Sequence, residues 1–259
     1  MHTVALEVAY NGAPFCGFAR QEGGLLTVQG ELEDALRLLY KRDVATTCAG
    51  RTDAGVHALG QVVSFDLAED ELETRPLRAL RRSLDAITHE SISVRDARRV
   101  PDGFSARFDA VSREYHYHIA LGPSRPVFMR DFSWHVPDVL DVDAMRAGAS
   151  YLIGEHDFKS FCRSASAEGK PTCRTVMEVD LALDCIMGEQ VLVLKVVGNA
   201  FLHSMVRTIV GTLVAVGRGM RSPEWVGEAL AACDRRAAGE TAPAQGLVFW
   251  KVNYRGADE

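Results

Sequence analysis

The stretch that most constrains the fold is residues 48–65, CAGRTDAGVHALGQVVSF. It begins at the end of an apolar segment and ends in an alternating one, so it predicts a loop between two strands. A cation, a hydroxyl, a carboxylate and an imidazole stand close together in it, at Arg51, Thr52, Asp53 and His57. Its glycines permit close backbone approach. Such a loop often presents reactive groups, but a plain turn with Asp53 bonded to its own backbone fits equally well.

The rest of the chain predicts an α+β protein. Residues 3–10 alternate like a strand, Thr27 is placed to cap a helix, and residues 43–49 and 59–67 are expected as the strands on either side of the loop. Further elements are a helix after Thr74 and a strand at 91–98, then strands at 112–121, 174–183, 190–197 and 246–254 and helices at 141–152, 201–216 and after Ser222. Because strand, helix, strand, strand occurs twice, we expect two similar halves, residues 1–105 and 106–259.

Charge is unevenly distributed along the chain. The 259 residues carry a net charge of −6, yet residues 75–113 hold nine arginines and five acids, and residues 66–73 hold five acids. A local basic groove is therefore compatible with an acidic total. The alternative is a pair of solvated faces with local ion pairs.

Other features point to a cytoplasmic protein without a metal site. The six cysteines are scattered and form no C-x-x-C pair, which disfavours a zinc ribbon. The start of the chain has no secretory pattern, so free thiols in a reducing cytoplasm are expected. The apolar segment 201–216 is too short to cross a bilayer and contains His203 and Arg207, which predicts a core helix. Residues 164–172, SASAEGKPT, are expected to be mobile.

Several motifs together resemble the bacterial tRNA pseudouridine synthase A family. They are AGRTDAGVHALGQV, YNGAPFCGF, PDGFSARFDAVSREYHY, FLHSMVRTIVGTLVAVG and APAQGL, in the family's order. The resemblance implies mixed, mainly antiparallel sheets around a central cleft and a homodimer that binds tRNA. It also implies isomerisation of uridines 38, 39 and 40 in the anticodon stem-loop. That reaction has no redox change and no group donor, so no cofactor or metal is expected.

The resemblance also implies roles for individual residues. Asp53 matches the family's nucleophilic aspartate, and Arg207 matches the arginine associated with it. Tyr115 matches the active-site tyrosine, whose ring can stack on uracil or whose phenol can handle a proton. Each has an ordinary alternative: a turn cap, an arginine extended to the surface, and a core aromatic, the last of which is expected for Tyr117.

Two further positions match substrate contacts of the family. Arg51 matches an arginine that occupies the space left by an extruded uridine, and Leu247 matches an apolar residue that packs on the base. Their alternatives are a surface ion pair and a core leucine. No role is assigned to His57.

The chain departs from the family pattern at two places. Phe18 and Ala19 stand where Trp and Gln are usual, which removes one polar side chain, and SLDAITHESISV replaces Asn-Ala-x-Leu-Pro. Two other functions fit parts of the sequence: a non-catalytic RNA-binding protein, and an aspartate-dependent phosphotransferase or metal hydrolase. Paired aspartates and a phosphate loop, which the last requires, are missing from the sequence.

Overall fold

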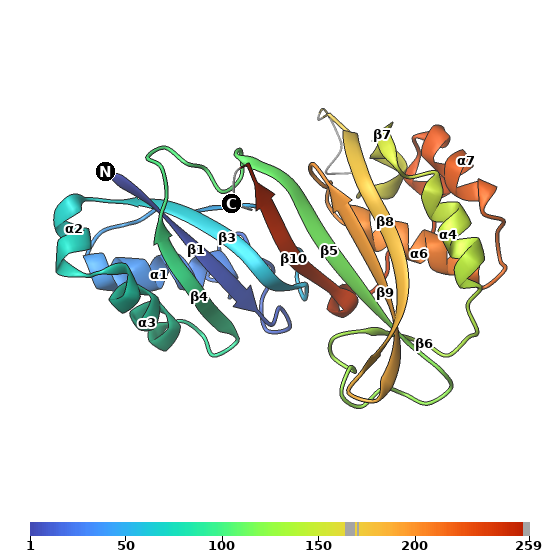
Figure 1. Cartoon of the computed structure of the whole chain (residues 1–259), viewed down its shortest axis with the longest axis horizontal. Coiled ribbons are helices and arrows are strands. Elements are labelled where there is room, and N and C mark those ends of the chain that lie inside the picture. Colours follow the sequence, from blue (N-terminus) through green and yellow to red (C-terminus); the bar gives the residue numbers. More distant parts are fainter. Residues whose placement is uncertain (164–168, 170, 256–259) are drawn as a thin grey trace. The chain divides into compact units, whose positions relative to one another are not determined.

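In the computed structural model, residues 1–163, 169 and 171–255 are described, and they form two compact units (Figure 1). The first comprises Met1–Arg113 and the chain from Phe249 onward, and the second is Glu114–Val248. Both combine helices with mainly antiparallel strands, so the predicted α+β class is confirmed. That the chain consists of two similar halves meeting near residue 105 stays a prediction.

The sheet of the first unit is built around β1 (His2–Tyr10). This strand pairs antiparallel with both β3 (His57–Leu67) and β4 (Ile92–Arg99). The order of strands is β4-β1-β3-β10, where β10 is Leu247–Tyr254 and its first two residues belong to the second unit. β1 and β3 are buried over most of their length. The loop that precedes β3 therefore ends on a rigid strand.

Three helices accompany this sheet: α1 (Val28–Tyr40), α2 (Glu69–Thr74) and α3 (Leu77–Ile87). α1 begins as predicted, because the Thr27 hydroxyl accepts a hydrogen bond from the Gly30 N–H at 3.2 Å. α1 contacts α3, and α3 packs along β4 with Leu80 and Leu84 fully buried. The other side chains of α3 include exposed arginines.

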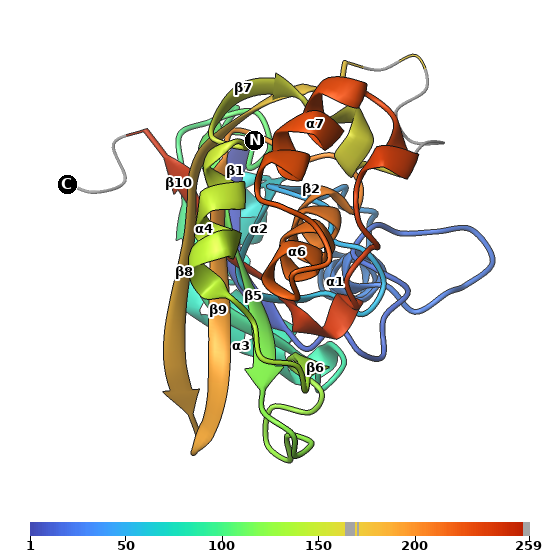
Figure 2. The ribbon, with the colours of Figure 1, turned by 90° about the vertical axis from the view of Figure 1, so that its right-hand side faces the viewer.

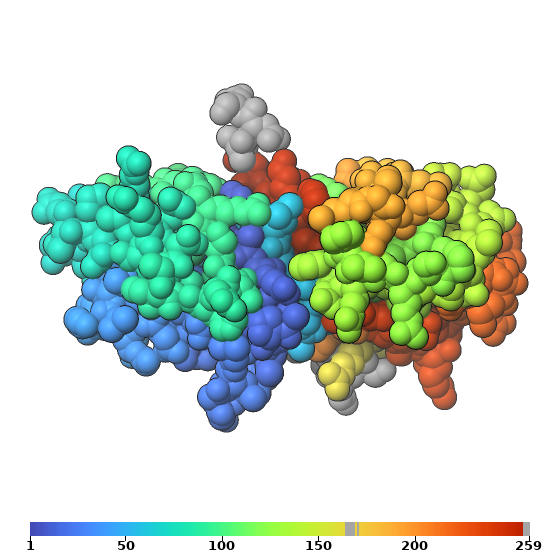
Figure 3. All heavy atoms as spheres, turned by 90° about the horizontal axis from the view of Figure 1, so that it is seen from below, coloured from blue at the N-terminus to red at the C-terminus, as the bar shows by residue number. Residues whose placement is uncertain are grey.

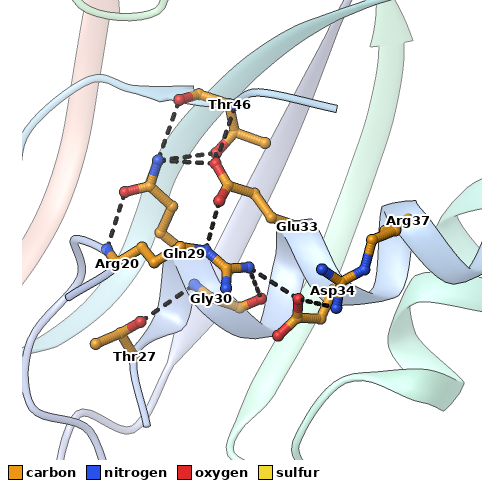
Figure 4. Close-up of polar contacts among 8 residues, drawn as sticks. All are labelled: Arg20, Thr27, Gln29, Gly30, Glu33, Asp34, Arg37 and Thr46. Atoms are coloured by element: carbon orange, nitrogen blue, oxygen red, sulfur yellow. Dashed lines mark hydrogen bonds and ion pairs between the residues drawn. The ribbon is translucent and has the colours of Figure 1, made fainter. Parts of the chain in front are cut away.

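The strand expected at residues 43–49 is mostly wrong, since only β2 (Thr47–Cys48) pairs with β3. Side chains of α1 form hydrogen bonds with the backbone of Thr46, the residue just before β2 (Figure 4). The Thr46 N–H donates to Glu33 Oε1 at 3.2 Å, and Gln29 Nε2 donates to the Thr46 carbonyl at 3.2 Å. With these groups bonded to the helix, this end of the segment has no sheet ladder to join.

The second unit places helices on one side of an antiparallel sheet (Figure 2). Its strand order is β5-β9-β8-β7, with the short β6 parallel to β5. The strands are β5 (Ala110–Leu121, beginning in the first unit), β6 (Trp134–Val136), β7 (Gly154–Asp157), β8 (Cys173–Ile186) and β9 (Glu189–Gly198). The helices are α4 (Val142–Ser150), α6 (Met205–Gly217) and α7 (Glu224–Ala232).

Helix α6 is the predicted core helix. Nearly all its residues are buried, and it packs against α4, which lies along β8. In the described residues, no helix is long and apolar enough to cross a membrane. The stretch 164–172, expected to be mobile, lies for the most part outside the described residues.

Candidate active site

Asp53 lies in the loop between β2 and β3, as the sequence predicts. The Val56 N–H donates to the Asp53 carbonyl at 3.2 Å, which closes a tight turn, and Gly55 adopts a φ of +77° within it. Asp53 is half-buried, whereas Arg51, two residues earlier, is exposed. The loop thus holds a partly buried carboxylate and an exposed cation.

A contact between Gly12 and His57 fixes the far end of this loop. The Gly12 N–H donates to His57 Nδ1 at 3.0 Å, and His57 is buried. The backbones also touch: a Cβ on Gly12 would lie 2.0 Å from the Val56 carbonyl oxygen. Only glycine fits there without moving the loop. His57 therefore positions the turn that carries Asp53, and its Nδ1 has to be unprotonated to accept this bond.

The residue before Asp53 is held from two further sides. The Thr52 hydroxyl and the Tyr10 hydroxyl are hydrogen-bonded at 2.8 Å, and both residues are buried. The Thr52 carbonyl accepts the N–H of Phe18 at 3.1 Å, while Gly17, at a φ of +103°, passes close to the same carbonyl. Phe18, one of the two departures from the family pattern, is fully buried against Tyr10, so its side chain belongs to the core.

Two side chains secure the beginning of the loop. Gln61 Nε2 donates to the Gly50 carbonyl at 2.7 Å. The Arg113 guanidinium is buried and donates to the Ala49 carbonyl from Nε and Nη2, each at 3.1 Å. A buried cation is costly unless its donors are used, and here it ties the chain ahead of Asp53 to the start of β5. The loop is anchored at its start, at its middle and at its end.

Burial keeps the neighbouring thiol of Cys48 neutral. Burial raises the pKa of Cys48 to about 11, although Arg51 and Arg107 act on it in the opposite direction. Cys48 is therefore not a nucleophile near neutral pH. Arg51 makes no hydrogen bond or ion pair with any residue that the structure describes, so its guanidinium is available to a ligand.

Tyr115 and Tyr117 lie two apart on β5 and have different surroundings. Tyr117 is fully buried, its hydroxyl donates to the Pro243 carbonyl at 2.8 Å, and burial raises its pKa far above the ordinary value. It is the core aromatic that was expected. Tyr115 is also buried and packs edge-to-face on Phe201, with ring centroids 5.0 Å apart. Its face is therefore oriented by another aromatic ring.

The remaining two predicted site residues also lie in the second unit. Arg207 is half-buried in the first turn of α6, and its Nε donates to the Ala242 carbonyl at 2.7 Å. Leu247 is buried at the first position of β10. It follows Gly246, where a Cβ would lie 2.5 Å from the Tyr117 ring. The structure thus places Arg51 and Asp53 in one loop, and Tyr115, Arg207 and Leu247 on regular elements of the second unit.

Comparison with known proteins assigns the chain to a family. The model of a tRNA pseudouridine synthase family matches residues 7–109 and 149–255. The chain belongs to this family. Among curated proteins named tRNA pseudouridine synthase A, that of Brevibacillus brevis is 46% identical and covers 95% of this chain and 97% of its own. That of Thermotoga maritima is 40% identical and covers 98% of this chain and all of its own. The family's enzymes are isomerases, and so is this protein.

The sequence did not reveal the anchors of the Asp53 loop. Gly12 was visible only as a turn residue and Arg113 only as part of an arginine-rich stretch, and both act through contacts far along the chain. Across the described ranges no group of three or more His, Cys, Asp or Glu side chains is placed to hold a metal ion. The expectation that no metal is needed stays a prediction.

Proposed function

We propose that the protein converts uridines 38, 39 and 40 in the anticodon stem-loop of tRNA to pseudouridine, with Asp53 as nucleophile. Family membership supports the reaction on tRNA. The observation that carries the assignment to Asp53 is its loop: a half-buried carboxylate on a turn whose backbone is bonded at Gly50, Thr52 and Val56. A turn used only to connect strands has no need of so many anchors. We also propose a homodimer that acts in the cytoplasm.

The chemistry is a rearrangement within one nucleotide. The N1–C1′ bond of uridine breaks, a C5–C1′ bond forms, C5 loses its proton and N1 gains one. A carboxylate can act as nucleophile toward the sugar or the base, and the two routes share the same atoms and charges overall. Partial burial of Asp53 removes part of the hydration shell of its carboxylate, which makes the carboxylate a better nucleophile. A fixed loop holds it in a reactive orientation.

Arg207 and Tyr115 are proposed to complete the reacting centre. A nearby cation favours the ionised form of a carboxylate, and Arg207, half-buried at the start of an apolar helix, is the cation that the resemblance implies. Its bond to the Ala242 carbonyl holds the guanidinium at that end of the helix. Tyr115, oriented by Phe201, is proposed to stack on the uracil or to take up the proton from C5.

Arg51 and Leu247 are proposed to bind the substrate. A uridine in a stem has to leave the base stack to be reached, and the exposed, unengaged Arg51 is suited to fill the vacated space and contact phosphates. The buried Leu247 is proposed to offer an apolar surface to the flipped base. The alternative of a non-catalytic RNA-binding protein is disfavoured, because a carboxylate held beside RNA would only repel phosphates.

The test uses an unmodified tRNA transcript, folded beforehand and then incubated with the protein in EDTA without nucleotide. We expect pseudouridine at positions 38–40 with wild type and none with Asp53→Asn, while the tRNA affinity of that variant stays near normal. Asp43→Asn, which changes an exposed acid four residues before β2, is the control and should be fully active. Substantial pseudouridine from Asp53→Asn would remove Asp53 from its role, and activity that required a divalent ion would contradict the cofactor-free reaction.

A further inference from the structure

The loop before β5, residues 105–109, has a fixed backbone. The Ser105 N–H donates to Asp109 Oδ2 at 2.7 Å, and the Asp109 N–H donates to the Ser105 carbonyl at 3.1 Å. Ala106 is buried between them: its N–H donates to Ser64 Oγ at 3.0 Å and its carbonyl accepts the Tyr254 hydroxyl at 2.8 Å. The conformation of this loop is therefore set by the protein before any ligand binds.

This fixed loop holds a large apolar ring in solvent. Phe108 is 79% exposed, and the guanidinium carbon of the exposed Arg107 lies 5.4 Å from the centroid of its ring. An exposed apolar residue alone requires no explanation. A rigid backbone that presents an aromatic ring with a cation on it is a different case, because each of these features favours the binding of a π-system or an anion.

The same loop is tied to the chain that leads to Asp53. Arg113 donates from one guanidinium to the carbonyls of Arg107 and Ala49, and Ala49 stands four residues before Asp53. Arg107 and Arg51 also both act electrostatically on the Cys48 thiol. Phe108 and its cation thus belong to the same end of the first unit as Arg51, where two guanidiniums supply positive charge.

We propose that Phe108, with Arg107 across its ring, is a stacking platform for an unpaired base of the RNA substrate, and that Arg107 binds a neighbouring phosphate. This inference rests on the proposed function. Stacking of a base on an aromatic ring is tolerant of sequence, and a cation beside the ring matches the phosphate that every nucleotide carries. The platform adds affinity and orientation and takes no part in the chemistry.

The experiment measures the affinity of the Asp53→Asn protein for the unmodified tRNA, with each further substitution placed in that background. Phe108→Ala should raise the Kd about tenfold, as expected for the loss of one stacked base. Phe108→Trp should restore binding, and Phe108→Leu, which keeps apolar area without a π-face, should not. The matched control is Leu38→Ala, an exposed residue of α1 in the same unit, which should leave the Kd unchanged.

Salt dependence separates the ring from the cation. Arg107→Gln should flatten the log–log slope of affinity against salt by about one, because one phosphate contact is lost. Phe108→Ala should weaken binding without changing that slope. Because Phe108 is exposed, its variants should unfold at the temperature of the parent protein.

Several results would overturn the inference. They are a Kd for Phe108→Ala equal to that of the parent, full rescue by leucine, or a change in molecular mass without a change in Kd, which would assign the ring to contact with another copy of the chain. Pseudouridine formation by wild type on the same tRNA is scored separately. Its failure would remove the proposed function, whereas the Kd series decides whether Phe108 stacks on RNA in either case.

Discussion

The Asp53 loop and helix α3, both in the first unit, use polar residues in opposite ways. Around Asp53, buried polar groups bond one another: Gly12 with His57, Tyr10 with Thr52, and Gln61 with Gly50. On α3, Arg78 and Arg82 are exposed and make no hydrogen bond or ion pair with any residue in the described part of the chain. Groups that are bonded internally set geometry, and groups that are left in solvent remain for a ligand.

The acidic residues 66–73, which precede α3, do not pair with the exposed arginines of that helix. Glu71 forms an ion pair with Arg42, with Nε and Oε1 2.7 Å apart, and Glu69 contacts His2 and lies 4.0 Å from Arg99. The alternative that these acids neutralise Arg78 and Arg82 therefore finds no support. The segment that contains α2 and α3, teal in Figure 3, lies at the surface of the first unit.

Gly12→Ala should give the largest effect on stability and would break the bonded side of the comparison. Its Cβ would lie 2.0 Å from the Val56 carbonyl oxygen, and neither backbone can yield without moving the Asp53 turn. We expect a loss of about 3 kcal/mol in the free energy of unfolding, as for severe overpacking, together with a large loss of kcat. Urea unfolding and single-turnover assays measure the two.

The control for this variant is Gly23→Ala, in the same N-terminal loop. Gly23 has a φ of +85° but nothing within 4 Å of an added Cβ, so only backbone strain of about 1 kcal/mol is expected. Equal effects of the two substitutions would show that the approach of Gly12 to Val56 is not what fixes the turn.

His57 is expected to rank second. His57→Leu leaves the buried Gly12 N–H without an acceptor, which should cost about 1–3 kcal/mol of stability and lower kcat more than it raises KM. His57→Asn keeps an oxygen near the position of Nδ1 and should recover much of both. If asparagine is no better than leucine, the imidazole acts by its shape, and the assignment of His57 as a hydrogen-bonding anchor is wrong.

Tyr10→Phe should lower the stability of the Asp53 loop by less than the changes at Gly12 and His57. It removes the hydroxyl that meets Thr52 Oγ1 but keeps the ring that packs on Phe18. The expected cost is about 1 kcal/mol, since one neutral hydrogen bond is lost. The double variant Tyr10→Phe/Thr52→Val should cost less than the sum of the two single changes, because it removes both partners. Strict additivity in thermal unfolding would argue against a direct bond.

Local chemistry made much of this fold predictable from the sequence. Alternation located β1 and β3, and the Thr27 cap located α1, because each depends on residues close together in the chain. The anchors of the Asp53 loop were not predictable, since Gly12 and His57 are 45 positions apart and no periodicity relates them. The strand predicted for residues 43–46 was wrong for the same reason, because Glu33 and Gln29 of α1 form hydrogen bonds with the backbone of Thr46.

The site divides in the same way. Arg51 and Asp53 could be assigned to one loop because they are only two positions apart in the sequence. Tyr115 and Leu247 were named through resemblance. Arg207 was named through resemblance and because an arginine in an apolar helix is costly unless it is paired. Phe108 escaped notice because exposure is a property of the folded chain, and its sequence neighbours resemble any polar loop.

The smallest effect on stability, and the clearest effect on tRNA binding, are expected from changes to the exposed arginines of α3. Arg78→Gln/Arg82→Gln removes two exposed, unengaged guanidiniums four residues apart on one face of α3. The free energy of unfolding should change by less than about 0.5 kcal/mol. If this face lines the RNA, tRNA affinity should fall and the salt slope should flatten by about two, with the rate at saturating tRNA unchanged.

The matched control is Arg37→Gln/Arg146→Gln, which removes the same charge from two helices where each arginine already pairs with an aspartate three residues earlier. Because the two doubles change the net charge equally, any general electrostatic effect on RNA binding appears in both. A difference confined to the α3 pair locates the contact, whereas equal affinities and slopes for the two doubles would mean that exposed, unpaired arginines on this helix face away from the tRNA.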